Sequence, residues 1–182
     1  MIIKIIEKIS YQQVLIINFL FSFCALVLVY ISQYFFDLLP CILCIYQRIP
    51  LAIILITTIT SLILATKKYS KKINQQIIKN LSLAIITLSL LSNVILSFYH
   101  SGVERKIFKM TTKCQSDQSL NPQDLEQLRA MIANAKLAKC DDISFSFLKL
   151  SMANWNLIFT LGLMTLVICF ILKNYCKKKN YH

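Results

Sequence analysis

The chain has 182 residues, of which 57% are apolar and only 15% charged, and its mean hydropathy is +0.62. These values exclude an ordinary soluble domain and indicate a membrane protein. The scarcity of glycine and the unbroken apolar runs argue against a β-barrel, and the net charge of +12 lies mostly beside the apolar segments, which argues against nucleic-acid binding.

The first apolar segment, at about residues 14–36, predicts a membrane-spanning helix that is kept in the mature protein. It follows Lys4 and Lys8, as the core of a signal peptide would. A signal peptide, however, has an apolar core of roughly 7–15 residues and a small-residue cleavage site. This segment is longer and ends at Asp37, so we expect an uncleaved first span.

A Cys-x-x-Cys pair opens the second predicted span, at about residues 45–66. Pro40 suits a helix start, so Cys41 and Cys44 are expected in the first turn, where unpaired N–H groups and the helix dipole favour a thiolate. Arg48 follows Cys44 by four residues and therefore lies on the same helix face. Because a cation at the edge of hydrocarbon is costly, Arg48 is a candidate functional residue.

Two further spans are predicted at about residues 79–99 and 155–173. Lysines concentrate in both terminal tails and in the connection between the second and third spans, so the positive-inside rule places these pieces in the cytoplasm. The Cys-x-x-Cys turn and the loop of about residues 100–154, which mixes acids and bases, are expected on the opposite, oxidising side. The predicted fold is an all-α membrane protein, one integral domain over residues 1–182 that forms a four-helix transmembrane bundle.

A short amphipathic helix is predicted within the long outer loop. Asn121 and Pro122 match a helix cap and first helical position, and Leu125, Leu128 and Ala135 recur at helical spacing. The periodicity leaves two placements open, on the membrane–water interface or against the loop itself.

The cysteines divide into two groups. Three lie in spans or in the cytoplasmic tail and are expected to be packing residues: Cys24, Cys169 and Cys176. Four lie in the two outer connections: Cys41, Cys44, Cys114 and Cys140. On the oxidising side, these four are able to form two disulfides, and spacing does not decide among the three possible pairings.

Three kinds of chemistry compete for the four outer cysteines. Structural zinc usually takes ligand pairs of short spacing, whereas Cys114 and Cys140 are far apart, so no metal site is expected. Static disulfides fit less well than exchange, because a Cys-x-x-Cys ring is short and strained. Neither alternative explains Arg48. Disulfide exchange, in which one pair passes electrons to the next, is favoured.

Electrons that reach a Cys-x-x-Cys pair at the membrane need an acceptor. The chain has no Cys-x-x-Cys-His haem motif and only two histidines, His100 and His182. A lipid-soluble quinone is the natural acceptor, and Arg48 suits a quinone oxygen that carries negative charge. His100, at the outer end of the third span, either shares in quinone binding or is a hydrated interfacial ring.

These features together resemble the DsbB family of disulfide bond formation proteins. The resemblance rests on the spans, on the two loop cysteines, and on three stretches at residues 40–48, 99–104 and 151–156, and it covers nearly the whole chain. It implies a bacterial inner-membrane enzyme with cytoplasmic termini and periplasmic redox loops. Such an enzyme reoxidises a periplasmic thioredoxin-like thiol oxidase of the DsbA type and passes the electrons to ubiquinone or menaquinone.

The resemblance also implies a role for each outer cysteine. Cys114 is attacked by the thiolate of the reduced partner, which releases Cys140. Cys140 then exchanges with Cys41, and Cys44 faces the quinone.

Two further positions correspond to the quinone site of the family, Arg48 and His100. The family often carries an acid before the arginine, whereas this chain has Gln47, which offers Arg48 no counter-charge. Two alternatives to the general enzyme remain, a paralogue that serves one dedicated partner and a membrane scaffold stapled by disulfides. The scaffold leaves Arg48 unexplained.

Overall fold

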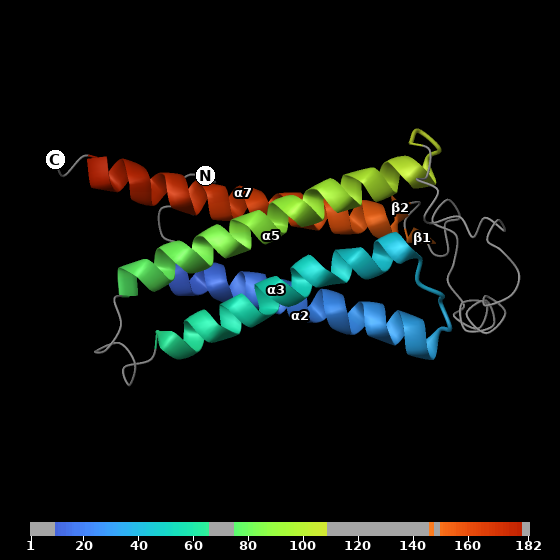
Figure 1. Ribbon diagram of the computed structural model, residues 1–182, viewed down its shortest axis with the longest axis horizontal. Coiled ribbons are helices and arrows are strands. Elements are labelled where there is room, and N and C mark those ends of the chain that lie inside the picture. The colour runs from blue at the N-terminus through green and yellow to red at the C-terminus, as the bar shows by residue number, and fades with distance from the viewer. Residues whose placement is uncertain (1–9, 66–74, 109–145, 148–149, 180–182) are drawn as a thin grey trace, which may run out of the picture.

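The structure is a computed structural model that describes residues 10–65, 75–108, 146–147 and 150–179. The described part contains four long helices: α2 (Tyr11–Phe35), α3 (Ile42–Leu64), α5 (Gln75–Glu104) and α7 (Met152–Lys179). Each is long and apolar enough to cross a membrane. The predicted all-α bundle of four membrane helices is thereby confirmed (Figure 1). The amphipathic helix predicted in the loop lies outside the described residues.

The helix ends next to the predicted Cys-x-x-Cys site lie together at one end of the bundle. Figure 1 shows the α2–α3 connection, the end of α5 and the start of α7 at one end, with the N- and C-termini at the other. α3 packs against α2 and α5, and α5 packs against α7. A two-residue antiparallel ladder precedes α7, formed by β1 (Ser146–Phe147) and β2 (Leu150–Ser151). The sequence did not predict this hairpin.

Local signals in the sequence explain where α2 begins. Ser10 is its N-cap, and the Ser10 Oγ accepts a hydrogen bond from the Gln13 N–H group at 3.3 Å. The Gln13 Oε1 accepts in return from the Ser10 N–H group at 2.8 Å, which completes a capping box. The helix therefore starts slightly before the predicted span.

α5 ends in a Schellman motif. Lys106 adopts a left-handed conformation with a φ of 58°. Its N–H group donates to the Val103 carbonyl at 2.9 Å, and the Ile107 N–H group donates to the Gly102 carbonyl at 2.9 Å. These bonds satisfy carbonyls that a helix end otherwise leaves without partners.

The helix end lies beyond the predicted end of the third span at residue 99. As a result α5 includes His100 and Glu104, which the sequence analysis placed in the loop. Both side chains are held by the same helix as the membrane-spanning segment before them.

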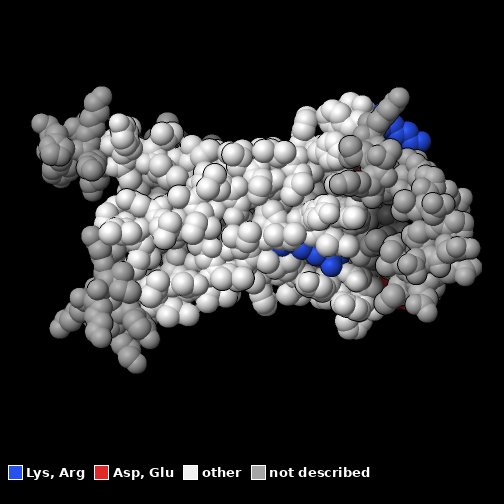
Figure 2. Space-filling model, viewed as in Figure 1, with Lys and Arg blue, Asp and Glu red and all other residues white. Residues whose placement is uncertain are grey.

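The apolar core fills the half of the bundle nearer the termini. Its buried members come from all four helices: Val14, Leu15, Ile54, Leu83, Ile86, Leu90, Leu163, Val167 and Phe170. Apolar side chains also cover the outside, and Leu28, Ile56 and Leu88 are each more than 60% exposed. Figure 2 shows a face that is almost free of charge along the helices, with the visible charged atoms toward the end where α3 begins. Such a surface fits contact with lipid.

Candidate functional site

The Cys-x-x-Cys pair lies at the N-terminus of α3. Cys41 is the N-cap, so it precedes the first helical turn that was expected to contain it, and Cys44 lies within that turn. The Cys41 Sγ accepts a hydrogen bond from the Cys44 N–H group at 3.3 Å, and the Cys41 S–H group donates to the Cys44 Sγ at 3.1 Å. A sulfur thus occupies the place where a capping oxygen usually binds the first N–H groups of a helix. This environment favours the thiolate form of Cys41.

His100 approaches the same sulfur from α5. Its Nε2 lies 3.5 Å from the Cys41 Sγ and 3.7 Å from the Glu104 Oε1. The His100 side chain is almost fully buried, with a residue exposure of 3%. The expectation of a hydrated interfacial ring is therefore wrong. His100 belongs to the thiol site, because α5 continues as a helix past it.

Arg48 is held by neutral groups. Its Nη1 donates to the Gln33 Oε1 at 2.9 Å, and its guanidinium carbon lies 5.1 Å from the centre of the Tyr30 ring. Within the described residues no carboxylate forms an ion pair with Arg48. Its buried Nε also has no hydrogen-bond partner in the described part of the chain. A buried polar donor without a partner is unusual in folded proteins.

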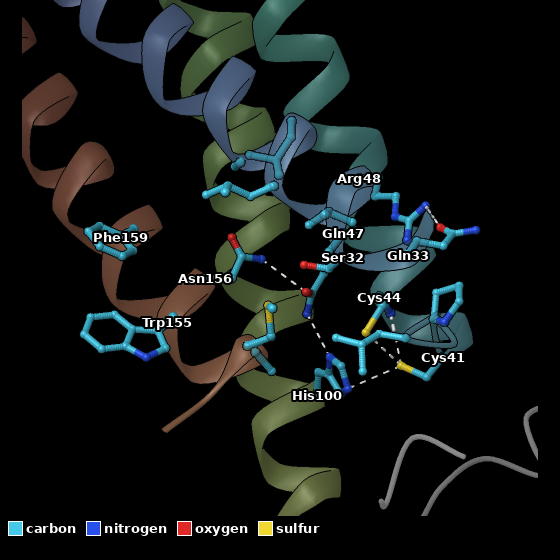
Figure 3. Close-up of a pocket in the computed structure, with 18 of the residues that line it drawn as sticks. Ser32, Gln33, Cys41, Cys44, Gln47, Arg48, His100, Trp155, Asn156 and Phe159 are labelled. Atoms are coloured by element: carbon cyan, nitrogen blue, oxygen red, sulfur yellow. Dashed lines mark hydrogen bonds between the residues drawn. The ribbon is translucent and has the colours of Figure 1, made fainter. Parts of the chain in front are cut away.

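A cavity of about 400 Å³ joins these groups. It lies among α2, α3, α5 and α7, and its lining is mostly apolar, with the aromatic rings of Trp155 and Phe159 on one wall. Cys44, Arg48 and His100 all face it (Figure 3). Apolar walls with a few convergent polar groups, in a volume of this size, are typical of sites for small organic ligands.

Gln47 turns away from Arg48 and toward His100. The Gln47 Nε2 lies 3.2 Å from the His100 Nδ1, and the Gln47 Oε1 accepts from the Asn156 Nδ2 at 3.2 Å. The Gln47 side chain therefore bridges α3, α5 and α7 (Figure 3). It is buried, with an exposure of 7%. Gln47 is thus a partner of the histidine and supplies nothing to the arginine.

The hairpin before α7 is fastened to the end of α5. The Ser151 hydroxyl donates to the Glu104 carboxylate, and the Ser101 hydroxyl donates to the Asn154 Oδ1 at 2.6 Å. Both bonds lie beside the thiol site, because Glu104 also contacts His100. The start of α7 is thereby fixed relative to the Cys41 sulfur.

The remaining cysteines lie in three places: outside the described residues, in the cavity lining, and on α7 away from the cavity. Cys114 and Cys140 lie outside the described residues. Cys24 lines the cavity, while Cys169 and Cys176 lie on α7 outside the cavity lining.

The sequence predicted no metal site. The ligand atoms of Cys41, Cys44 and His100 nevertheless lie within 4.8 Å of one another, a three-donor cluster of a kind that soft metals accept. The same sulfurs are required for exchange in the predicted relay. The absence of a functional metal therefore stays a prediction.

Several site residues were missed in the sequence, although a signal for some of them exists. Polar side chains recur every three or four residues along α5, at Ser89, Asn93, Ser97, His100 and Glu104. Such a stripe inside an apolar span indicates a buried polar contact surface. No comparable local signal identifies Gln33 as the partner of Arg48, since that contact depends on how α2 packs against α3.

Comparison with known proteins agrees with this arrangement. The chain matches the family described as "Disulfide bond formation protein DsbB" over residues 11–170. It is also 30% identical over 166 residues to the "Uncharacterized protein RP370" of Rickettsia prowazekii (strain Madrid E), with 90% of each chain covered. The name of this relative states no function. Because the family match runs from the start of α2 into α7, the chain belongs to the DsbB family of disulfide bond formation proteins.

Proposed function

We propose that the protein is a protein dithiol:quinone oxidoreductase. Its electrons come from a periplasmic thioredoxin-like protein of the DsbA type and pass through the loop pair Cys114 and Cys140. They then reach the Cys-x-x-Cys pair and end on ubiquinone or menaquinone. One observation carries the proposal: Cys44 and Arg48 line the same cavity, beside the buried contact between Cys41 and His100.

The residues around the cavity fit a quinone. The apolar lining and aromatic wall suit a flat ring, and the volume of about 400 Å³ suits a ligand head group. Arg48 lines the cavity, and its guanidinium supplies a positive charge that forms no ion pair in the described part of the chain. A bound quinone supplies an acceptor for two electrons and two protons.

The chemistry of the chain itself follows from the geometry at the start of α3. When the bond between the Cys41 and Cys44 sulfurs forms, the dithiol loses two electrons and two protons. The Cys44 N–H group and the helix N-terminus favour the thiolate of Cys41, which is the form that attacks a disulfide. Arg48 stabilises negative charge that develops on a ligand oxygen. The apolar walls keep water from the reacting groups.

In this proposal the cavity end of the bundle faces the periplasm. At the other end of the bundle α2 and α5 begin and α3 and α7 end (Figure 1), and in the sequence the lysine-rich tails and the lysine-rich connection adjoin these helix ends. The positive-inside rule supports a cytoplasmic location for that end. An oxidising periplasm is also the compartment in which exchange with a thiol oxidase takes place.

The role of Cys44 is tested by replacing it with serine. We expect purified Cys44→Ser protein to lose quinone reduction when it is given the reduced partner, because the disulfide between Cys41 and Cys44, whose formation releases the two electrons, can no longer form. Cys169→Ser is the matched control, since Cys169 does not line the cavity. Quinone reduction is followed by absorbance. If Cys44→Ser reduces quinone at the normal rate, the assignment of Cys44 is wrong.

The partner is tested by trapping. In Cys140→Ala protein, Cys114 is a free thiol, so the trap uses the oxidised partner. The Cys114 thiolate attacks the partner's disulfide and releases one partner thiol, and the mixed disulfide, which Cys140 cannot resolve, should accumulate and be identified by mass spectrometry. Capture of a general DsbA-type oxidase supports the main proposal, and capture of one other protein supports the dedicated paralogue. A scaffold would trap no partner, and its disulfides would stay oxidised in cells starved of quinone.

A further inference from the structure

The two ring nitrogens of His100 face different partners. Nδ1 faces the Gln47 Nε2 at 3.2 Å, and Nε2 faces the Cys41 Sγ at 3.5 Å and the Glu104 Oε1 at 3.7 Å. A neutral imidazole carries its hydrogen on one nitrogen only, and the partner of the other nitrogen decides which one. The direction of the hydrogen bond from Gln47 therefore sets what His100 offers to the sulfur.

The direction of the Gln47 hydrogen bond follows from a series of hydrogen bonds that begins at a backbone carbonyl in α7. The Thr160 hydroxyl lies 2.6 Å from the Asn156 carbonyl oxygen, and a carbonyl only accepts. The hydroxyl hydrogen is thus committed, so the Thr160 Oγ has to accept from its other neighbour, Asn93. The Asn93 Nδ2 lies 3.2 Å away and donates. This fixes which end of the Asn93 amide is NH₂.

The same direction passes from Asn93 to Asn156. With its NH₂ toward Thr160, the Asn93 amide also donates to the Asn156 Oδ1 at 3.4 Å, which fixes the oxygen end of the Asn156 amide. The Asn156 Nδ2, on the other side of that amide, donates to the Ser97 Oγ at 3.0 Å. The NH₂ end of Asn156 therefore faces α5 and α3. Asn93 and Thr160 are fully buried, so no water replaces these partners.

The hydrogen bond from Asn156 fixes the orientation of the Gln47 amide, and the Gln47 amide in turn fixes its hydrogen bond to His100. Because the Asn156 NH₂ group points at it, Gln47 has to present its carbonyl oxygen there and its own NH₂ group to His100 (Figure 3). In the opposite orientation, two NH₂ groups would face each other at 3.2 Å. An N–H donor meets a lone pair, so the His100 Nδ1 carries no hydrogen and Nε2 carries it.

We propose that Gln47 is a positioning residue that locks His100 in the Nε2–H tautomer and makes it a hydrogen-bond donor to the Cys41 sulfur. The Cys41 Sγ then receives N–H groups from both Cys44 and His100. Two such donors favour the thiolate. The Glu104 carboxylate is a second acceptor near the same hydrogen and helps to keep it on Nε2. The catalytic consequence rests on the proposed function, whereas the tautomer does not.

An amide at position 47 is needed to donate a hydrogen bond to the His100 Nδ1. An ionised glutamate there would only accept a hydrogen bond, so the facing Nδ1 would have to carry a hydrogen. With an amide at position 47, the His100 Nδ1 accepts a hydrogen bond, and the ring hydrogen stays on Nε2, next to the Cys41 sulfur. His100 therefore acts as a donor to Cys41, and it does not take the proton of the thiol.

The tautomer can be read directly by ¹⁵N nuclear magnetic resonance of the imidazole ring. The chain has two histidines, so His182→Gln leaves His100 as the single histidine signal. In the full-length reduced protein in detergent, we expect the hydrogen on Nε2. With Gln47→Glu added, we expect Nδ1 to be protonated. A hydrogen on Nδ1 in the protein with Gln47, or an unprotonated Nδ1 with Gln47→Glu, would overturn the proposal.

A distant substitution tests the origin of the direction. Thr160→Val removes the hydroxyl that orients Asn93, so we expect signals of both tautomers of His100. The matched control is Thr165→Val, because the exposed Thr165 hydroxyl also donates to a carbonyl of α7, that of Leu161 at 2.8 Å, but lies outside the polar chain. The control should leave the histidine spectrum unchanged. An unchanged spectrum in Thr160→Val would show that the direction does not come from Thr160.

Activity measured on the same preparations separates the two proposals. We expect Gln47→Leu, which leaves the tautomer free, to slow disulfide exchange at Cys41 about tenfold, as for the loss of a hydrogen bond to a charged group. An inactive protein with the Nε2–H tautomer would contradict the proposed function alone. A fully active Gln47→Leu protein with mixed tautomers would contradict the role of the tautomer.

Discussion

At the scale of single residues, Arg48 carries its charge into an apolar cavity with neutral partners. The Gln33 amide and the Tyr30 ring hold the guanidinium but cancel none of its charge. The lining is mostly apolar, so the field of this cation is weakly screened. Such a cation favours a ligand that gains negative charge during the reaction.

Replacing Arg48 by lysine tests this reasoning. Lysine keeps the charge but loses the planar group that donates to Gln33. We expect Arg48→Lys to raise the KM for a soluble quinone by about tenfold or more, roughly the contribution of one charge-assisted hydrogen bond. Steady-state kinetics measure the effect. Arg105→Lys, at an exposed arginine outside the cavity lining, is the control, and an unchanged KM in Arg48→Lys would contradict the assigned role.

At the scale of elements, α5 supplies the polar groups of the site to both of its neighbours. His100 contacts Cys41 and Gln47 of α3, while Asn93 and Ser97 contact Asn156 of α7. A helix that carries a buried polar stripe needs a partner for every group on it, because an unpaired polar group in hydrocarbon is costly. The rotation of α5 about its own axis is therefore fixed by hydrogen bonds as well as by apolar packing.

The two glycines of the chain differ in how closely other side chains approach them. The chain has two glycines, Gly102 in α5 and Gly162 in α7. A Cβ atom at Gly102 would lie 2.1 Å from the Phe108 ring, whereas nothing lies within 4 Å of one at Gly162. We expect Gly102→Ala to lower the free energy of unfolding by about 1–3 kcal/mol.

Gly162→Ala should instead raise the free energy of unfolding by about 0.5–1 kcal/mol, because alanine favours a helix interior more than glycine does. Thermal unfolding in detergent, followed by circular dichroism, measures both changes. Equal effects of the two substitutions would show that Phe108 does not pack on Gly102 as described.

At the scale of the whole molecule, the sequence predicts what local patterns encode. The spans follow from long apolar segments, and the grouping of Cys41, Cys44 and Arg48 follows from spacing on one helix. The contacts between helices do not follow in this way. Gln33 meets Arg48, and Gln47 meets Asn156, only because of how the helices are rotated and shifted against each other. Position 47 remained unexplained in the sequence for this reason.

The orientation of the bundle in the membrane is tested by labelling. We expect a protein whose only thiol is the exposed Cys176 to react with an impermeant maleimide only after the inner membrane is opened, since the C-terminus is proposed to be cytoplasmic. A variant with Lys106→Cys as the only thiol, at the opposite end of the bundle, should react in cells whose outer membrane alone is permeable. The reverse pattern would invert the proposed topology.

The hairpin before α7 limits the distance between Cys140 and Cys41. Ser151 is bonded to Glu104, which contacts His100 beside Cys41, so the hairpin lies close to the sulfur that we propose exchanges with Cys140. The chain from Cys140 to Ser146 reaches at most about 20 Å when fully extended. A tether of this length keeps the effective concentration of one thiol near the other in the millimolar range. Longer insertions between Cys140 and the hairpin should therefore slow the internal exchange gradually and leave the encounter with the external partner at Cys114 unaffected.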